Sequence, residues 1–239
     1  MSIPKNSQSS GTTSLPALPA YLEDTYSWAY VTPDAIKRFE RQWLVNLILW
    51  GNFARLRDLA LDSFGERLQG PSLQIACVYG NLTAHLAARH ISENQLDVID
   101  VLPTQIDNLK RKLGPDSQVR VHLANSAALP QANATYERAL LFFLLHEQTL
   151  YVRIQTIREA FRVVKPGGKI TFVDYHRPKP WHPLYLVMKA VLTKLEPFAL
   201  DLWNTEIEEW FPGDMPAASI SKQTHFGGLY QIVEVTRQA

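Results

Sequence analysis

The stretch Leu73–Thr83, which reads LQIACVYGNLT, decides the fold because it has the form of a strand that turns directly into a helix. Turns of this kind that bind nucleotides usually carry an acid and three glycines. Here the corresponding positions are Gln74, Ala76, Val78 and Gly80, so one glycine remains. Two explanations are open: the turn has decayed, or its ligand lies in a different orientation.

Short apolar runs alternate with helical stretches from residue 72 onward, which is typical of a parallel α/β sheet. The runs predict strands near 72–77, 96–101, 119–123, 138–143 and 169–174, with helices near 82–90, 103–113 and 150–164. Pro166, Gly167 and Gly168 are expected to end the last helix and turn the chain into a strand. Residues 181–203 are predicted to be helical, and 225–237 to form a closing strand. The order predicts a doubly wound sheet.

The chain has 239 residues, a length that favours one domain. Residues 1–19 are rich in Ser, Thr and Pro and are expected to be a disordered tail, which leaves 20–239 as a single domain. This domain is predicted to have a helical cap at 20–68 and a helical insertion at 181–210. In the cap, Thr32 is a predicted N-cap with Pro33 at the first helical position. Trp43, Leu44, Leu47 and Ile48 form one apolar stripe.

The charges are balanced, with 24 Lys and Arg against 23 Asp and Glu, which argues against nucleic acid as a partner. The single cysteine, Cys77, allows no intramolecular disulfide. Together with the absence of a charged and apolar leader, this indicates a cytosolic chain. No run of apolar residues is long enough to span a bilayer.

In doubly wound sheets the ligand lies beyond the carboxyl ends of the strands. Asp100 ends the second predicted strand, 20 residues after Gly80, where an acid commonly binds two ribose hydroxyls. The alternative is a solvated carboxylate. His146 follows the fourth strand, and Asp174 and His176 follow the fifth, so all three are expected to face one crevice.

Imidazole and carboxylate groups suit both acid–base work and manganese binding, although each histidine could equally be a packing residue. Glu147, next to His146, could instead favour the start of the following helix. Cys77 is expected to be a small core residue rather than a nucleophile.

These strand-end segments, together with REAFRVVKPGG at 158–168, resemble the class I S-adenosylmethionine-dependent methyltransferases over roughly residues 70–178. The resemblance implies a mostly parallel, seven-stranded, Rossmann-like sheet with helical additions at both ends. It also implies that Asp100 binds the ribose, that Asn125 and Ser126 lie beside the adenine, and that Tyr79 and Gly80 lie near the methionine. Residues next to these complete the expected cofactor site: Ala76, Cys77, Val101 and Ala127.

Five segments are similar to one branch of this superfamily, the rhodoquinone biosynthesis family: YLEDTYSWAY (21–30), IACVYGNLT (75–83), FFLLHEQ (142–148), FVDYHRP (172–178) and EPFALDLW (196–203). This resemblance implies conversion of ubiquinone to rhodoquinone, in which an amine replaces a ring methoxy group. S-Adenosylmethionine would be the amino donor and manganese the metal. Asn81 stands where that family has an acid. The alternatives are a quinone C- or O-methyltransferase and a catalytically silent S-adenosylmethionine-binding regulator.

Amine transfer would require a base and a group that stabilises charge on the quinone oxygen. We expect Tyr79, His146, Asp174 and His176 to provide the catalytic groups, with the altered turn holding the methionine in a new orientation. Because ubiquinone has a long lipid tail, we also expect access to a membrane, with the protein peripheral at the inner membrane. The apolar segment Trp181–Trp203 could line a channel, lie on the bilayer, or simply pack over the sheet.

Overall fold

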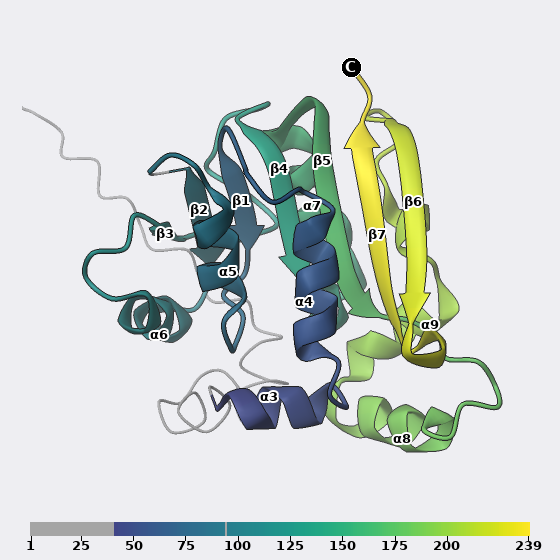
Figure 1. Cartoon of the computed structure of the whole chain (residues 1–239). Helices are drawn as coiled ribbons and strands as arrows, with labels where there is room; N and C mark the ends of the chain where they lie inside the picture. Colours follow the sequence, from purple (N-terminus) through teal and green to yellow (C-terminus); the bar gives the residue numbers. More distant parts are fainter. Residues whose placement is uncertain (1–40, 94) are drawn as a thin grey trace, which may run out of the picture.

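The computed structural model describes residues 41–93 and 95–239. The predicted tail, Thr32, Pro33 and the segment 21–30 lie outside the described residues. The sheet has seven strands in the order β3-β2-β1-β4-β5-β7-β6 (Figure 1). They are β1 (Ser72–Ile75), β2 (Leu96–Asp100), β3 (Arg120–Leu123), β4 (Tyr136–Phe142), β5 (Val164–Tyr175), β6 (Ala217–His225) and β7 (Tyr230–Arg237). The predicted doubly wound, seven-stranded sheet is confirmed.

Strands β1 to β5 pair in parallel, and β7 and β6 add an antiparallel edge. The apolar runs predict all five parallel strands and the closing strand β7, but they miss β6. This strand is the sheet edge and is largely exposed, so its sequence AASISKQTH has no apolar alternation to reveal it. Pairing with β7 is what makes it a strand.

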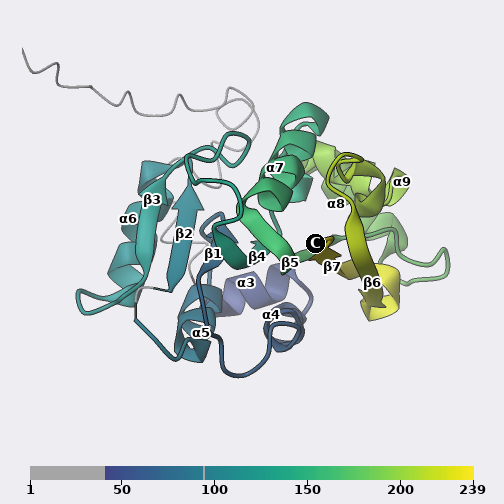
Figure 2. The same cartoon turned by 90° about the horizontal axis from the view of Figure 1, so that it is seen from above.

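Helices cover both faces of the sheet (Figure 2). The helices α4 (Phe53–Asp62) and α5 (Leu82–Arg89) lie on one face, and α7 (Leu150–Val163) lies on the other. The helix α6 (Pro103–Leu113) packs near β2 and β3. Because both faces are covered, the central strand β1 is buried at all its residues.

The predicted Lys-Pro-Gly-Gly turn lies within β5 as an irregularity, not before it. Tyr136 pairs with Val164, whereas Arg138 pairs with Lys169, so extra residues of β5 bulge out of the ladder. Gly167 has a φ of 78°, and a Cβ at Gly168 would lie 2.7 Å from the carbonyl oxygen of Glu137. The two glycines are therefore required where β5 is brought back into register.

Two helical segments lie beyond the carboxyl ends of the parallel strands, at the bottom of Figure 1: α3 (Gln42–Ile48) and α8 (Tyr185–Leu195). Short helices follow α8, namely η3 (Pro197–Leu200), α9 (Asp201–Asn204) and η4 (Ile207–Trp210), and two further single turns are η2 (Leu145–Glu147) and η5 (Phe226–Gly228). The stripe predicted in the cap does not pack on the sheet: Trp43, Leu47 and Ile48 are exposed, while Val45 is buried.

Candidate functional site

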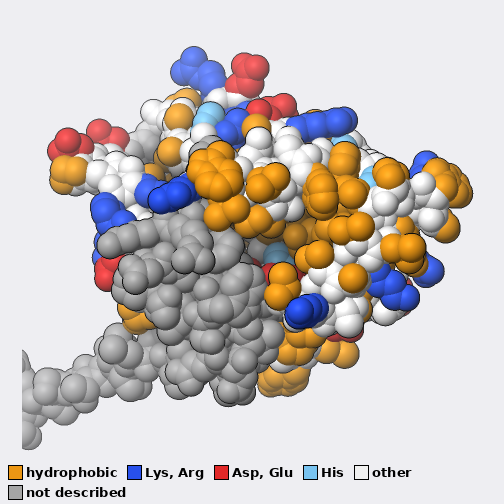
Figure 3. All heavy atoms as spheres, turned by 90° about the horizontal axis from the view of Figure 1, so that it is seen from below, with side chains coloured by type: hydrophobic (Ala, Val, Ile, Leu, Met, Phe, Trp, Pro, Cys, Tyr) orange, Lys and Arg blue, Asp and Glu red, His pale blue; other side chains and the backbone are white. Residues whose placement is uncertain are grey.

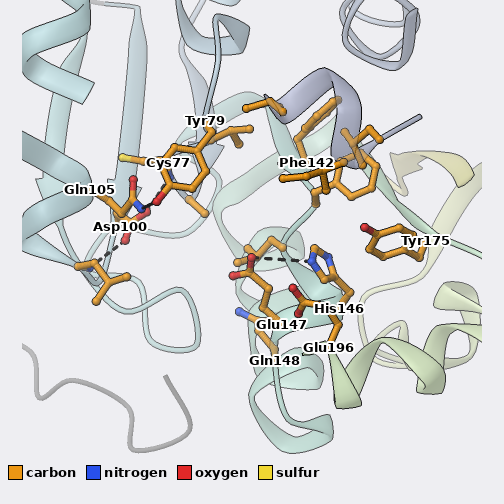
Figure 4. Close-up of a pocket in the computed structure, with 18 of the residues that line it drawn as sticks. Cys77, Tyr79, Asp100, Gln105, Phe142, His146, Glu147, Gln148, Tyr175 and Glu196 are labelled. Carbon is orange, nitrogen blue, oxygen red and sulfur yellow. Dashed lines mark hydrogen bonds and ion pairs between the residues drawn. The ribbon is translucent and has the colours of Figure 1, made fainter. Parts of the chain in front are cut away.

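A cavity of about 510 Å³ lies between the carboxyl ends of β1, β2, β4 and β5 and the helices α3 and α8. Its size is within the range of small-molecule sites, and most of its lining is apolar. Polar groups gather at two ends of it (Figure 4). Cys77, Tyr79, Asp100 and Gln105 lie at one end, and His146, Glu147, Gln148, Tyr175 and Glu196 lie at the other.

The structure brings most of the predicted site residues to this cavity. Those that line it are Ala76, Cys77, Tyr79, Asp100, Val101, Asn125, Ser126 and His146. Three further predicted residues do not line the cavity but directly neighbour a lining residue in the sequence: Gly80, Ala127 and Asp174. His176 lies elsewhere: its Nδ1 is 2.8 Å from the carbonyl oxygen of Gly228, and its Nε2 is 3.6 Å from Glu206.

The turn after β1 keeps the backbone shape of a glycine turn. Ala76 has a φ of 76° and Gly80 a φ of 81°, both in the left-handed region. This conformation costs an alanine about 1 kcal/mol, which contacts around the turn must offset. One such contact is the N–H of Cys77, which donates to Oδ2 of Asp100 over 2.7 Å. Burial and the charge of Asp100 raise the pKa of the Cys77 thiol, so the thiol remains neutral.

Two side chains of one helix hold the rest of the turn. From α6, Gln105 donates to the hydroxyl of Tyr79 over 2.8 Å. Lys112, also on α6, donates to the carbonyl oxygens of Val78 and Gly80 at 3.1 and 2.8 Å. These supports were missed by the sequence analysis, because nothing in the helical pattern of α6 shows which side chains reach the turn.

Asn81, at the end of the turn, is also engaged. Arg57 of α4 donates to its Oδ1 over 2.7 Å. Asn81 stands where the rhodoquinone biosynthesis family has an acid. In this chain it is hydrogen-bonded to the buried Arg57. Through this hydrogen bond, α4 supports the turn after β1.

Asp100 is buried at the end of β2, and its two oxygens already accept backbone hydrogen bonds. Oδ1 accepts from Leu102 at 2.8 Å, and Oδ2 accepts from Cys77. Burial raises the pKa of Asp100 to about 6, although these two hydrogen bonds act in the opposite direction. At neutral pH the group is mainly a carboxylate, and its remaining lone pairs can accept hydrogen bonds from a ligand.

The end of β3 supplies a second polar group. Asn125 Oδ1 accepts from the N–H of Ala127 at 2.9 Å, and the hydroxyls of Ser126 and Thr156 are 2.8 Å apart. Gln148 donates to Ser126 over 3.0 Å, and its own Oε1 is buried without a hydrogen-bond partner among the described residues. Gln148 was not predicted as a site residue, although it lies in the FFLLHEQ segment.

His146, on η2 after β4, is buried and oriented by Asp174. Its Nδ1 lies 2.9 Å from Oδ1 of Asp174, while its Nε2 is 3.8 Å from Oε1 of Glu147. Burial by itself lowers the pKa of His146, but the charge and hydrogen bond of Asp174 outweigh it and raise the pKa to about 9. The ring is therefore an imidazolium at neutral pH, with Asp174 fixing Nδ1 and with Nε2 on the side of Glu147, which also lines the cavity.

The turn that carries His146 is anchored by Arg153 of α7, which is fully buried. Its guanidinium donates to the carbonyl oxygens of Leu145 and Gln148, on either side of His146, at 2.9 Å each. It also donates to the carbonyl oxygen of Phe198 at 2.8 Å. Arg153 thus connects η2 to the segment between β5 and β6.

The described residues do not form a manganese site. Among residues 41–93 and 95–239, no group of three or more His, Cys, Asp or Glu side chains has an arrangement that could hold a metal ion. The expectation of manganese has no support in this part of the chain, and no chemical step is assigned to a metal.

Comparison with protein families matches residues 73–168 to a methyltransferase domain. This match covers less than half of the chain. It is 25% identical over 211 residues to an uncharacterized methyltransferase of Synechocystis sp., covering 87% of this chain and 93% of that protein. It is 26% identical over 125 residues to 2-phytyl-1,4-naphtoquinone methyltransferase of Nostoc sp., covering 51% of this chain and 54% of the relative. The second match therefore spans about half of each protein.

Solved structures support the fold of the chain. Geranyl diphosphate C-methyltransferase from Streptomyces coelicolor has a TM-score of 0.59 at 14% identity, covering 93% of this chain and 99% of that one. At this identity the likeness concerns the fold alone. The predicted class I methyltransferase fold is confirmed, whereas nothing in these matches is specific to rhodoquinone biosynthesis.

Protonation of His146 should make the stability of the protein depend on pH. Its folded-state pKa of about 9 is above the ordinary value of 6.5. The folded state therefore binds more protons than the unfolded state between these values, and this contribution is complete below 6.5 and is lost as the pH rises through 9. We expect the melting temperature to fall over this range in the wild type, and less so in His146→Gln. Equal pH slopes in the two proteins would contradict the assigned protonation.

Proposed function

We propose that this protein is an S-adenosylmethionine-dependent transferase that acts on a lipophilic quinone. One observation carries the proposal: a single, mostly apolar cavity joins the turn and Asp100 at one end to the imidazolium of His146 at the other. A cofactor at the first end and a flat apolar ring at the second would then meet inside one chamber. The similarity to a naphtoquinone methyltransferase supports the choice of ring.

The cofactor end has a suitable group for each part of S-adenosylmethionine. Asp100 would accept hydrogen bonds from the ribose hydroxyls, and Asn125 and Ser126, with Val101 and Ala127 beside them, would face the adenine. The turn, including Ala76, Cys77, Tyr79 and Gly80, would hold the methionine part. At the other end, His146 would donate a proton or a hydrogen bond to the ring oxygen, where negative charge develops.

Two groups of the cofactor could be transferred, and we propose the amine. The α-amine, after losing a proton, would attack the ring carbon that carries a methoxy group. His146 would stabilise the charge on the quinone oxygen until methoxide leaves. Removal of the α-proton would then pass two electrons into the quinone ring, which gives the hydroquinone and an imine between the nitrogen and the α-carbon. Water would hydrolyse this imine, leaving the amine on the ring and releasing the former cofactor as an α-keto acid. The altered turn, in which Tyr79 is held by Gln105, supports this choice because amine transfer requires the methionine part to be turned toward the ring.

Methyl transfer is the second candidate, and the quinone methyltransferase relative favours it. In that reaction the methyl group moves from sulfur to a ring carbon or oxygen of the reduced quinone, and S-adenosylhomocysteine forms. The two reactions are distinguished by incubating the protein with short-chain ubiquinone and S-adenosylmethionine labelled with ¹⁵N in the amine. Label in the quinone product supports amine transfer, a mass gain of one methyl group supports methyl transfer, and no conversion leaves a silent binding protein.

Substrate access is proposed to occur at a membrane surface formed by α3 and α8. No helix within residues 41–93 and 95–239 is long and apolar enough to cross a membrane. Apolar side chains nevertheless gather on the end of the molecule that holds the cavity (Figure 3). Exposed ones on or near these helices are Trp43, Leu47, Ile48, Trp50, Trp181, Leu186, Val187, Val191 and Leu195. Lys179, Lys189 and Lys194 are exposed on the same segment as α8 and suit anionic lipid head groups.

The first prediction of this function concerns Asp100. Asp100→Ala should weaken S-adenosylmethionine binding by on the order of 2 to 4 kcal/mol, because two charge-assisted hydrogen bonds to the ribose are lost. Calorimetric titration measures the change. A thermal unfolding curve serves as the control, since the N–H groups of Cys77 and Leu102 also lose their acceptor. Unchanged affinity in a folded variant would reject the ribose assignment.

The second prediction concerns Tyr79. Tyr79→Phe keeps the ring but removes the hydroxyl that Gln105 holds, so S-adenosylmethionine should still bind while turnover falls. Tyr79→Gly should loosen the turn and shift the products toward methyl transfer. Mass spectrometry of the quinone products measures both effects, with Gln105→Ala as a matched control that removes the partner of the hydroxyl. Full amine transfer in all three variants would show that the turn does not direct the chemistry.

The third prediction concerns the membrane surface. Val187→Glu places a charge on α8 and should weaken binding to vesicles that contain anionic lipid by about tenfold, since a buried valine contributes about 1.5 kcal/mol. Ile220→Glu is the matched control, because Ile220 on β6 is 48% exposed and Val187 is 47% exposed. Vesicle sedimentation measures binding. Equal binding of both variants would contradict a surface at α8, and binding only to neutral vesicles would contradict the role of the lysines.

A further inference from the structure

Tyr175, the last residue of β5, has a hydroxyl that is open to the cavity and that the fold does not use. Its side chain lines the cavity and the residue is only 6% exposed. Its backbone N–H and C=O have partners in Asp174 and Gln231, but within the described chain its hydroxyl makes no hydrogen bond. In Figure 4 this hydroxyl points into the cavity, on the side where His146 lies.

Tyrosine hydroxyls in largely buried positions usually have a hydrogen-bond partner, and because that of Tyr175 is open to the cavity, a ligand there can supply one. Phenylalanine would fill the same space, so packing alone does not require the hydroxyl. Burial also raises the pKa of Tyr175 well above its ordinary value, so the group remains a neutral O–H donor. The features together are those of a donor kept for a ligand that is present only part of the time.

The surroundings of the hydroxyl indicate what this ligand group would be. The ring of Tyr175 lies edge to face with His146, with centroids 5.0 Å apart, and with Phe143, at 5.4 Å. Phe143 itself has a φ of 51°, an uncommon conformation for a bulky residue that directs the end of β4 toward this cluster. Aromatic walls and two donors, the Tyr175 hydroxyl and the His146 imidazolium, therefore meet at one end of the cavity. Such a site fits a flat ring that carries an acceptor oxygen.

We propose that the hydroxyl of Tyr175 donates a hydrogen bond to a carbonyl oxygen of the ring substrate and so fixes the orientation of the ring beside His146. This inference rests on the proposed function in so far as the ring is a quinone. It adds a substrate-binding residue that acts through its hydroxyl and not through its packing. The role differs from that of His146, because Tyr175 remains neutral and contributes to binding of the ground state.

The structure offers a matched control in Tyr230. Its ring centroid lies 5.8 Å from that of Tyr175, and its hydroxyl is buried without a partner among the described residues. Unlike Tyr175, it does not line the cavity. Tyr175→Phe and Tyr230→Phe therefore remove the same atom from the same aromatic cluster, and only the first removal reaches the substrate.

The test is a titration of both variants and the wild type with a short-chain ubiquinone. A second probe is its analogue in which both carbonyl oxygens are removed, which leaves a benzene ring with the same substituents. We expect Tyr175→Phe to bind the quinone about fivefold more weakly, the change that one neutral hydrogen bond produces, and to bind the analogue as the wild type does. Tyr230→Phe should bind both probes normally. In turnover assays, the loss in Tyr175→Phe should appear in KM more than in kcat.

S-Adenosylmethionine affinity, measured in parallel, reports whether each variant retains the folded cofactor end. Equal quinone affinity in Tyr175→Phe and the wild type would overturn the role of Tyr175 while leaving the proposed function intact. Equal losses in Tyr175→Phe and Tyr230→Phe would overturn it in favour of packing. A wild type that binds S-adenosylmethionine but neither probe would overturn the quinone substrate and, with it, this inference.

Discussion

Backbone N–H groups at the carboxyl ends of the parallel strands need hydrogen-bond acceptors, and two buried aspartates supply them. Asp100 accepts from Cys77 and Leu102, and Asp174 accepts from Leu145, His146 and Tyr175. Buried polar groups without partners cost several kcal/mol, so these carboxylates are conditions for the fold as well as candidate parts of the site. Each one also places a functional group: the turn after β1 in the first case, and the imidazole of His146 in the second.

The unusual turn is understandable once its neighbours are considered. Glycines allow a ligand-binding turn to adopt left-handed conformations at low cost, and Ala76 adopts one without that advantage. The chain offsets the cost with side chains from other elements, namely Arg57, Gln105 and Lys112, which bind the turn at Asn81, Tyr79 and its carbonyl oxygens. A turn that had merely decayed would have no reason to be held at so many points. This favours the explanation in which the ligand lies in a different orientation.

The segment between β5 and β6 covers the carboxyl ends of the parallel strands and so encloses the cavity there. Met188, Val191, Leu192 and Leu195 of α8 line the cavity, and Arg153 binds both the His146 turn and Phe198. A charged side chain that is fully buried is stable only where its hydrogen bonds are satisfied, so Arg153 requires η2 and the segment to be folded together. Burial in this chamber lowers the pKa of His146, and the charge and hydrogen bond of Asp174 outweigh that effect and raise it.

The sequence pattern was sufficient to predict the doubly wound sheet, because apolar runs and turn residues are local signals. It was also sufficient to place Asp100, His146 and Asp174 at strand ends, and the carboxyl ends of parallel strands lie on the same side of the sheet. It was not sufficient for β6, whose exposed residues become a strand only by pairing with β7. Nor did it separate His146, which faces the cavity, from His176, which binds the Gly228 carbonyl, although both directly follow strands. Whether a strand-end side chain points into a site depends on the bends that follow the strand and on the helices packed against it. The supports of the turn and the free hydroxyl of Tyr175 are contacts between residues far apart in the chain, so only the tertiary structure decided them.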